Sequence, residues 1–176
     1  RVCLLACSLA AFIIILERIF FYWRANRWEE REIKLIKVYL NQGKLEEAKA
    51  LTANWNSALG NIVNGMIKNW HNQELLELTA QTIGNEELHK FERGLGILNT
   101  IVTASPLLGL MGTVTGIIKS FHALSVMGGN QAMQLSLGIS EALYTTAFGL
   151  GIAIPSLFFL NYFYSIVDRK AQFLTA

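Results

Sequence analysis

Residues 96–164 read GILNTIVTASPLLGLMGTVTGIIKSFHALSVMGGNQAMQLSLGISEALYTTAFGLGIAIPSLFFLNYFY, and no other part of the chain constrains its architecture as strongly. Two long apolar segments lie here, residues 96–118 and 138–164. Each is near the roughly 20 residues that a helix needs to cross the hydrocarbon core of a bilayer. The sequence therefore predicts a hairpin of two membrane helices.

Both helices of this hairpin carry small and polar residues at spacings of three and four. They are Ser105, Gly109, Gly112, Thr113, Gly116 and Ser120 on the first helix, and Gly138, Ala142, Thr146, Gly149 and Ala153 on the second. Small residues at this spacing let helix backbones approach closely in a membrane, where dispersion and interhelical hydrogen bonds replace the hydrophobic effect. We therefore expect these two faces to pack on protein rather than on lipid.

An antiparallel hairpin would bring Thr113 level with Thr146 inside the hydrocarbon region, and Lys119 level with Glu141 near its edge. An ionisable group in a membrane segment usually faces a partner or a water path. We therefore predict that Lys119 and Glu141 form an ion pair, either across the hairpin or between subunits. The alternative for Lys119 is a side chain that extends to the membrane interface.

A third span is predicted at residues 1–23. Residues 2–16 are apolar, and they are followed by Glu17, Arg18 and the aromatic cluster at residues 19–23. A cleaved signal peptide would end at a small-residue site and then become polar, which this segment does not. The cluster suits a membrane interface. Because the sequence begins at Arg1, we expect the first span to be truncated at its start.

Basic residues set the expected orientation. They occur throughout residues 24–95 and again after the last span, whereas residues 126–137 carry no charge. Lys and Arg near span ends favour the cytoplasm. We therefore expect the N-terminus outside and the C-terminus in the cytoplasm. The predicted segments are the first span at 1–23, a cytoplasmic helical region at 24–95, the second span at 96–125, a turn outside the membrane at 126–137, which the family resemblance described below makes periplasmic, the third span at 138–167 and a cytoplasmic tail at 168–176.

The cytoplasmic region is expected to be helical. Apolar residues recur at helical spacing on both sides of a polar turn at residues 41–43. Further helices are predicted at 58–70 and 73–83, the second ending at Gly84 and Asn85. The segment after Asn85 has no breaker before Gly94, which predicts a helix that continues straight into the second span.

Several classes of function are disfavoured by composition. The formal net charge of +2 and the absence of a dense basic patch argue against nucleic-acid binding. Neither a nucleophile with its base, nor a phosphate loop, nor a metal cluster is evident, so we expect no enzyme, no cofactor and no metal. Cys3 and Cys7 are interpreted as small hydrophobic residues. Three spans without internal symmetry do not make a carrier. The faces of small residues predict that the chain self-associates. The hydroxyls at mid-depth predict a polar interior, for which a partner would supply a carboxylate.

SPLLGLMGTVTGI at residues 105–117 and GISEALYTTAFGLGIAIP at residues 138–155 resemble the two signature segments of the MotA/TolQ/ExbB proton channel family. Three spans with the N-terminus outside match its ExbB and TolQ branches, whereas MotA has four. The resemblance implies a homopentamer around a central pore that holds the membrane helices of an ExbD or TolR dimer. In this family an aspartate of that partner carries the proton.

Individual residues also match the family's pattern. The resemblance implies that Thr113 and Thr146 are pore threonines and that Glu141 is the membrane glutamate. Pro106 and Pro155 match the prolines of the two segments. This sequence departs from the pattern with Thr115, where many relatives have tryptophan, and with Tyr144 and Thr145, where small or aliphatic residues are usual.

The interpretation that follows is an all-α, three-span integral membrane protein of the bacterial inner membrane. We expect an ExbB-like subunit of a proton-driven motor that energises TonB-dependent transport across the outer membrane, without bound cofactor. A TolQ-like subunit of the Tol–Pal system is the first alternative, and a membrane scaffold without an ion pathway is the second. For Thr113 and Thr146 the alternative role is a packing residue whose hydroxyl bonds to the backbone.

Overall fold

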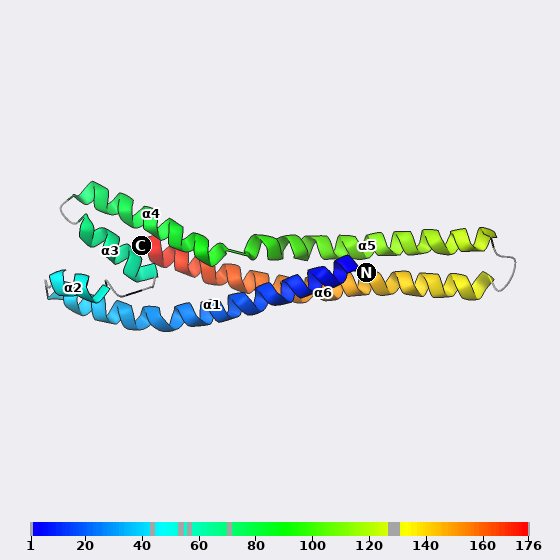
Figure 1. Cartoon of the computed structure of the whole chain (residues 1–176), viewed down its shortest axis with the longest axis horizontal. Coiled ribbons are helices and arrows are strands. Elements are labelled where there is room, and N and C mark those ends of the chain that lie inside the picture. Colours follow the sequence, from blue (N-terminus) through cyan, green and yellow to red (C-terminus); the bar gives the residue numbers. More distant parts are fainter. Residues whose placement is uncertain are drawn as a thin grey trace. The chain divides into compact units, whose positions relative to one another are not determined.

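The structure is a computed structural model that describes residues 2–42, 45–52, 55, 58–69, 72–126 and 131–175. Helices account for almost all of this part of the chain (Figure 1). They are α1 (Val2–Asn41), α2 (Leu45–Thr52), α3 (Ala58–Lys68), α4 (Gln73–Glu92), α5 (Leu95–Val126) and α6 (Gln131–Thr175). The expected all-α class is therefore confirmed.

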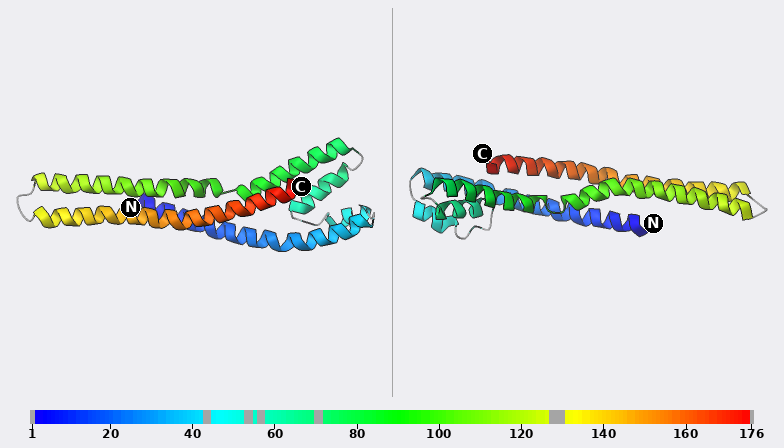
Figure 2. Two further views of the ribbon diagram at one scale, coloured as in Figure 1. Left: turned by 180° about the vertical axis from the view of Figure 1, so that it is seen from behind. Right: turned by 90° about the horizontal axis from the view of Figure 1, so that it is seen from above.

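The chain divides into two compact units. The first contains Arg1–Leu16 and Gly94–Phe163, and the second contains Glu17–Arg93 and Tyr164–Ala176. In the first unit, α5 and the facing part of α6 run antiparallel and side by side in every view (Figure 2). The hairpin expected from the two apolar segments is therefore present.

The second unit is held by polar contacts among short helices. Thr52 donates a hydrogen bond from Oγ1 to Oδ1 of Asn64, and Nδ2 of Asn64 donates to the Thr52 carbonyl at 2.8 Å, which ties α2 to α3. Glu87 is buried, and it accepts hydrogen bonds from Nδ2 of Asn61 at 2.7 Å and from Nζ of Lys90 at 2.6 Å. A buried carboxylate is tolerated when it is paired and hydrogen-bonded in this way.

Two predicted helix boundaries are wrong. α4 continues through Gly84 and Asn85 without a break, because packing against α3 outweighs the weak helix propensity of a single glycine. The predicted continuous helix into the second span is instead interrupted between α4 and α5. Gly94 adopts a φ of +80° there, in the left-handed region that glycine enters without a steric penalty.

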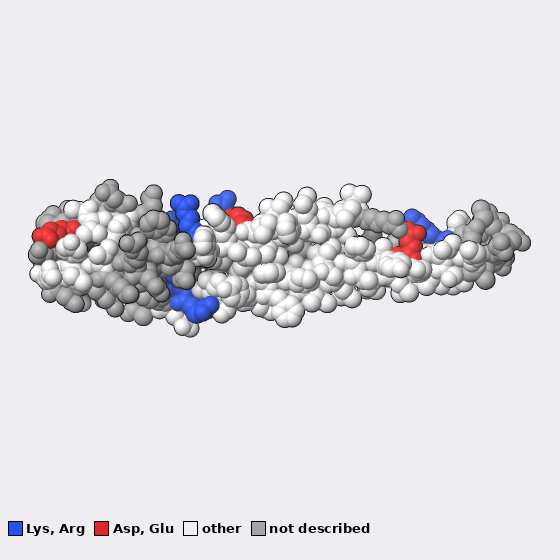
Figure 3. Space-filling model, turned by 90° about the horizontal axis from the view of Figure 1, so that it is seen from below, with Lys and Arg blue, Asp and Glu red and all other residues white. Residues whose placement is uncertain are grey.

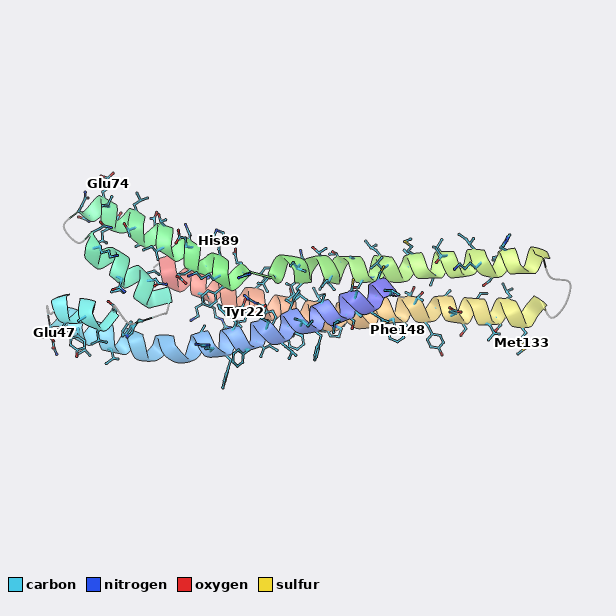
Figure 4. All side chains as sticks on the ribbon, in the orientation of Figure 1. Tyr22, Glu47, Glu74, His89, Met133 and Phe148 are labelled. Atoms are coloured by element: carbon cyan, nitrogen blue, oxygen red, sulfur yellow. The ribbon has the colours of Figure 1, made fainter. Side chains whose placement is uncertain are left out.

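Within the described residues, three helical stretches are long and apolar enough to cross a membrane: Val2–Ala25, Gln73–His122 and Leu135–Gln172. On the face shown in Figure 3, the described surface of the hairpin is uncharged over most of its length. Large apolar side chains such as Phe148 and Met133 point away from α5 (Figure 4) and are exposed in the single chain. The exact membrane boundaries of the six predicted segments stay predictions.

Candidate functional site

Glycines of both helices lie at the contact between α5 and α6, which we call the seam. A Cβ atom added at Gly109 would lie 3.0 Å from Cα of Thr146, and one added at Gly149 would lie 2.5 Å from the carbonyl oxygen of Ser105. One added at Gly116 would meet Ala142 at 2.7 Å. These atoms are at or close to the backbone, so they cannot move aside as a long side chain can. At Gly109, Gly116 and Gly149 the two helices therefore lie too close for a side chain.

The seam also fixes the register of the hairpin. From its open end toward its turn, Ser105 lies against Gly149, Gly109 against Thr146, Gly112 against Thr145, Gly116 against Ala142 and Ser120 against Gly138. Thr113 lies one helical turn beyond Gly109. The register therefore brings Gly109, rather than Thr113, closest to Thr146.

Both threonine hydroxyls donate to backbone carbonyls. Oγ1 of Thr146 donates to the carbonyl of Gly109 at 2.9 Å and so crosses from α6 to α5. Oγ1 of Thr113 donates to the carbonyl of Leu110, within its own helix, at 2.6 Å. Both side chains are half-buried, so part of each faces outward from the single chain. Whether they line a pore stays a prediction.

Helix geometry places the candidate residues on two sides of the seam. Each residue advances about 100° around its helix, and the two helices are antiparallel. Thr113 follows the contact residue Gly112 and Thr146 follows Thr145, so the two threonines lie on one side. Glu141 precedes the contact residue Ala142 and Lys119 precedes Ser120, so the two charged residues lie on the other side. Both charged side chains are exposed in the single chain, and the Lys119–Glu141 ion pair stays a prediction.

The two prolines lie inside helices. Pro106 is within α5 and Pro155 is within α6. Proline lacks the N–H that would bond to the carbonyl four residues earlier. Ala153, predicted to pack between helices, is buried.

The buried polar residues of the apolar helices include Ser156 and Arg18, which were not selected from the sequence, and Ser105, which was expected to pack on protein. Ser156 donates a hydrogen bond to the Ile152 carbonyl at 2.7 Å. Ser105 is fully buried in the seam. Arg18 is only 3% exposed. Its position next to Glu17 in an otherwise apolar segment was the available signal, since a charge in such a segment usually has a specific partner.

Comparison with known proteins adds to this geometry. The model of the MotA/TolQ/ExbB proton channel family matches residues 48–175, which include both signature segments and the whole seam. The chain belongs to this family. Within the described residues no group of three or more His, Cys, Asp or Glu side chains is placed to hold a metal ion.

Curated relatives carry the names of two branches of the MotA/TolQ/ExbB family. The ExbB-like 3 protein of Synechocystis is 33% identical over 95% of this chain and 81% of its own length. The ExbB-like 1 protein of the same organism is 35% identical over 68% of this chain, which spans about half (48%) of that relative. The Tol-Pal system protein TolQ of Haemophilus influenzae is 43% identical over 44% of this chain and 34% of its own length.

Membership in the MotA/TolQ/ExbB family and the three apolar helices together identify a multi-pass inner-membrane protein. Relatives named ExbB and relatives named TolQ both match, so the branch is not decided by these similarities.

Proposed function

We propose that this chain is the ExbB-like subunit of an inner-membrane motor driven by the proton motive force. Five copies surround a central pore, and the pore holds the membrane helices of an ExbD-like dimer. The motor energises TonB-dependent transport across the outer membrane. The N-terminus is periplasmic and the C-terminus is cytoplasmic. The observation that carries this proposal is the pair Thr113 and Thr146, which lie within the family's signature segments and on one side of the seam.

The proposed mechanism uses these hydroxyls as the polar lining at the depth of the partner's aspartate. Proton flow neutralises and releases that carboxylate in turn, and one charge that crosses 100 mV yields about 2.3 kcal/mol. Rotation of the partner within the ring converts this free energy into mechanical work. Glu141 and Lys119 pair on the opposite side of the seam, where an ion pair lowers the cost of placing either charge in a membrane segment.

A membrane scaffold without an ion pathway is the candidate function of another class. It needs only close packing, which the glycines provide, and the hydroxyls of Thr113 and Thr146 bond to backbone carbonyls as those of packing residues do. The double variant described below separates the two functions. A TolQ-like subunit remains a second candidate function, because TolQ proteins match this chain at an identity similar to that of an ExbB protein. Co-purification with a TolR-like rather than an ExbD-like partner would assign the chain to that branch.

The test of the ion pathway is the double variant Thr113→Val and Thr146→Val in the full complex. Valine keeps the β-branched shape and removes both hydroxyls, so assembly should persist while proton-driven activity is lost. Activity is measured as proton uptake by vesicles that contain the complex, and assembly by native mass spectrometry.

Thr115→Val is the matched control. Thr115 is exposed, and its hydroxyl donates within α5 to the carbonyls of Met111 and Gly112, so the control also removes a backbone-bonded hydroxyl from a membrane helix. It should retain activity. Full activity in the double variant would contradict the assigned role of the threonines, and loss of activity in the control would show that the effect is not specific to them.

A further inference from the structure

Arg18 is a charged residue in an apolar stretch, and in this structure it is almost completely buried. It lies within the candidate span Val2–Ala25, yet only 3% of it is exposed. A guanidinium in such a segment is costly unless its N–H groups have partners. The last turn of α4, which belongs to the same unit as Arg18, provides such a partner.

The guanidinium meets the last turn of α4. Nη1 of Arg18 donates to the carbonyl of Lys90 at 3.1 Å and to that of Phe91 at 3.5 Å. Nη2 pairs with Oε1 of Glu17 at 2.6 Å. The last four carbonyls of a helix have no partner within the helix, and a positive charge at this end also interacts favourably with the helix dipole.

Tyr22 binds the same helix end one turn further along α1. Its hydroxyl donates to the Phe91 carbonyl at 2.6 Å, and Figure 4 shows it between α1 and the end of α4. The Tyr22 ring stacks on that of Phe91 with centroids 6.0 Å apart, and Phe21 meets Phe91 edge-on at 5.3 Å. The Arg18 guanidinium in turn lies 4.7 Å from the centre of the Phe21 ring. Side chains of α1 therefore enclose the C-terminus of α4.

The backbone leaves the helical conformation at this end of α4. α4 ends at Glu92, Arg93 is extended with ψ 131°, and Gly94 has φ +80° before α5 begins. An α4 terminus without this support would be free to lose its last turn, because its carbonyls would have no protein donor.

We propose that Arg18 and Tyr22 form a cap, supplied by α1, that fixes the last turn of α4. Arg18 and Tyr22 are positioning residues that act through the backbone of α4, and this role is independent of whether the protein conducts protons. Arginine is required because its planar group presents several N–H donors in a fixed arrangement to two carbonyls and a carboxylate, whereas lysine has a single charged nitrogen.

The test is amide hydrogen exchange, measured by mass spectrometry, on the full chain in its purified complex. Arg18→Gln removes the charge and most of the donors. It should speed exchange in the peptide that covers residues 88–93 by about tenfold, the lower end of what loss of a charge-assisted hydrogen bond implies. Exchange in α5 and α3 should change much less. Arg18→Lys should give an intermediate rate in the same peptide.

Arg24→Gln is the matched control, because it removes the same charge from an exposed position on the same helix. It should leave the 88–93 peptide unchanged. If Arg18→Gln gave the same exchange as Arg24→Gln, the cap would be refuted.

Tyr22→Phe keeps the ring and removes one donor, so it remains informative if Arg18→Gln destabilises the whole protein. Exchange in the same peptide should rise by a smaller factor, confined to that peptide. No change in Tyr22→Phe, together with uniformly faster exchange in Arg18→Gln, would overturn the proposal, because Arg18 would then be a general stability residue.

Discussion

The seam between α5 and α6 and the joint between α1 and α4 hold pairs of helices by opposite means. At the seam, glycines remove side chains, and a single hydroxyl of Thr146 reaches the backbone of the other helix. At the joint, Arg18, Tyr22 and Phe91 fill the space with large groups and supply donors. The difference shows that the close approach of helices at the seam depends on the absence of side chains, whereas the contact at the joint depends on hydrogen bonds from side chains.

The largest effect that this comparison predicts is at Gly149. A methyl group there would lie 2.5 Å from the Ser105 carbonyl oxygen and 3.2 Å from Cα of Gly109, so Gly149→Ala forces the two helices apart. Overpacking of this kind costs about 1–3 kcal/mol of stability. Thermal unfolding of the detergent-solubilised complex should show a lower Tm and a loss of assembly.

Gly151→Ala is the control for this change. Its added methyl group would have no atom within 4 Å, and the residue lies on the same helix. Stability should be unchanged or slightly higher, because alanine favours helix over glycine. Equal Tm values for the two variants would contradict the inference that the seam has no space for an added side chain.

An intermediate effect is expected at Gly94, just before α5, where backbone conformation rather than volume opposes a side chain. Gly94→Ala places a Cβ on a residue at φ +80°, although the nearest atom, Cγ2 of Ile14, is 3.7 Å away. A left-handed conformation costs a non-glycine residue about 1–2 kcal/mol. Tm should therefore fall, whereas Gly96→Ala, within α5 and without neighbours, should not lower it. A fall of equal size in both variants would contradict the assigned strain.

The smallest effect is expected at Gly84, inside α4. Alanine there meets no atom within 4 Å and improves helix propensity, so Gly84→Ala should stabilise the protein by about 0.5–1 kcal/mol. Chemical or thermal denaturation would show this as a small rise in the midpoint. A decrease would indicate that α4 needs a flexible point at the position where a helix end was predicted from the sequence.

Much of the hairpin could be predicted from residue type and spacing. The length of the two apolar segments predicted the two spans, and small residues three and four positions apart predicted the face of each helix that packs on protein. The register could not be derived in this way, because it depends on which glycine each threonine meets. Thr146 lies over Gly109, where there is no side chain, and the other close pairs of the seam share this register.

The helix boundaries of the second unit show the limit of local reasoning. Gly84 and Asn85 are a reasonable stop signal, yet contacts with α3 keep α4 helical through them. The end of α4 is stabilised by Arg18 and Tyr22, whose partners Lys90 and Phe91 lie about seventy positions later in the sequence. A charge at Arg18 in an apolar segment indicated that a partner exists, but only the folded chain shows that the partner is the end of α4.

The hydrogen bond from Thr146 to Gly109 has a consequence for the chemistry of the pathway. A hydroxyl has one proton to donate, and in this structure both candidate threonines have committed theirs to a main-chain oxygen. Each hydroxyl can therefore only accept a hydrogen bond from a further group. In the proposed pathway, such a lining would accept a hydrogen bond from a protonated acid, and it would donate none to a carboxylate unless the Thr146 bond between the two helices opens.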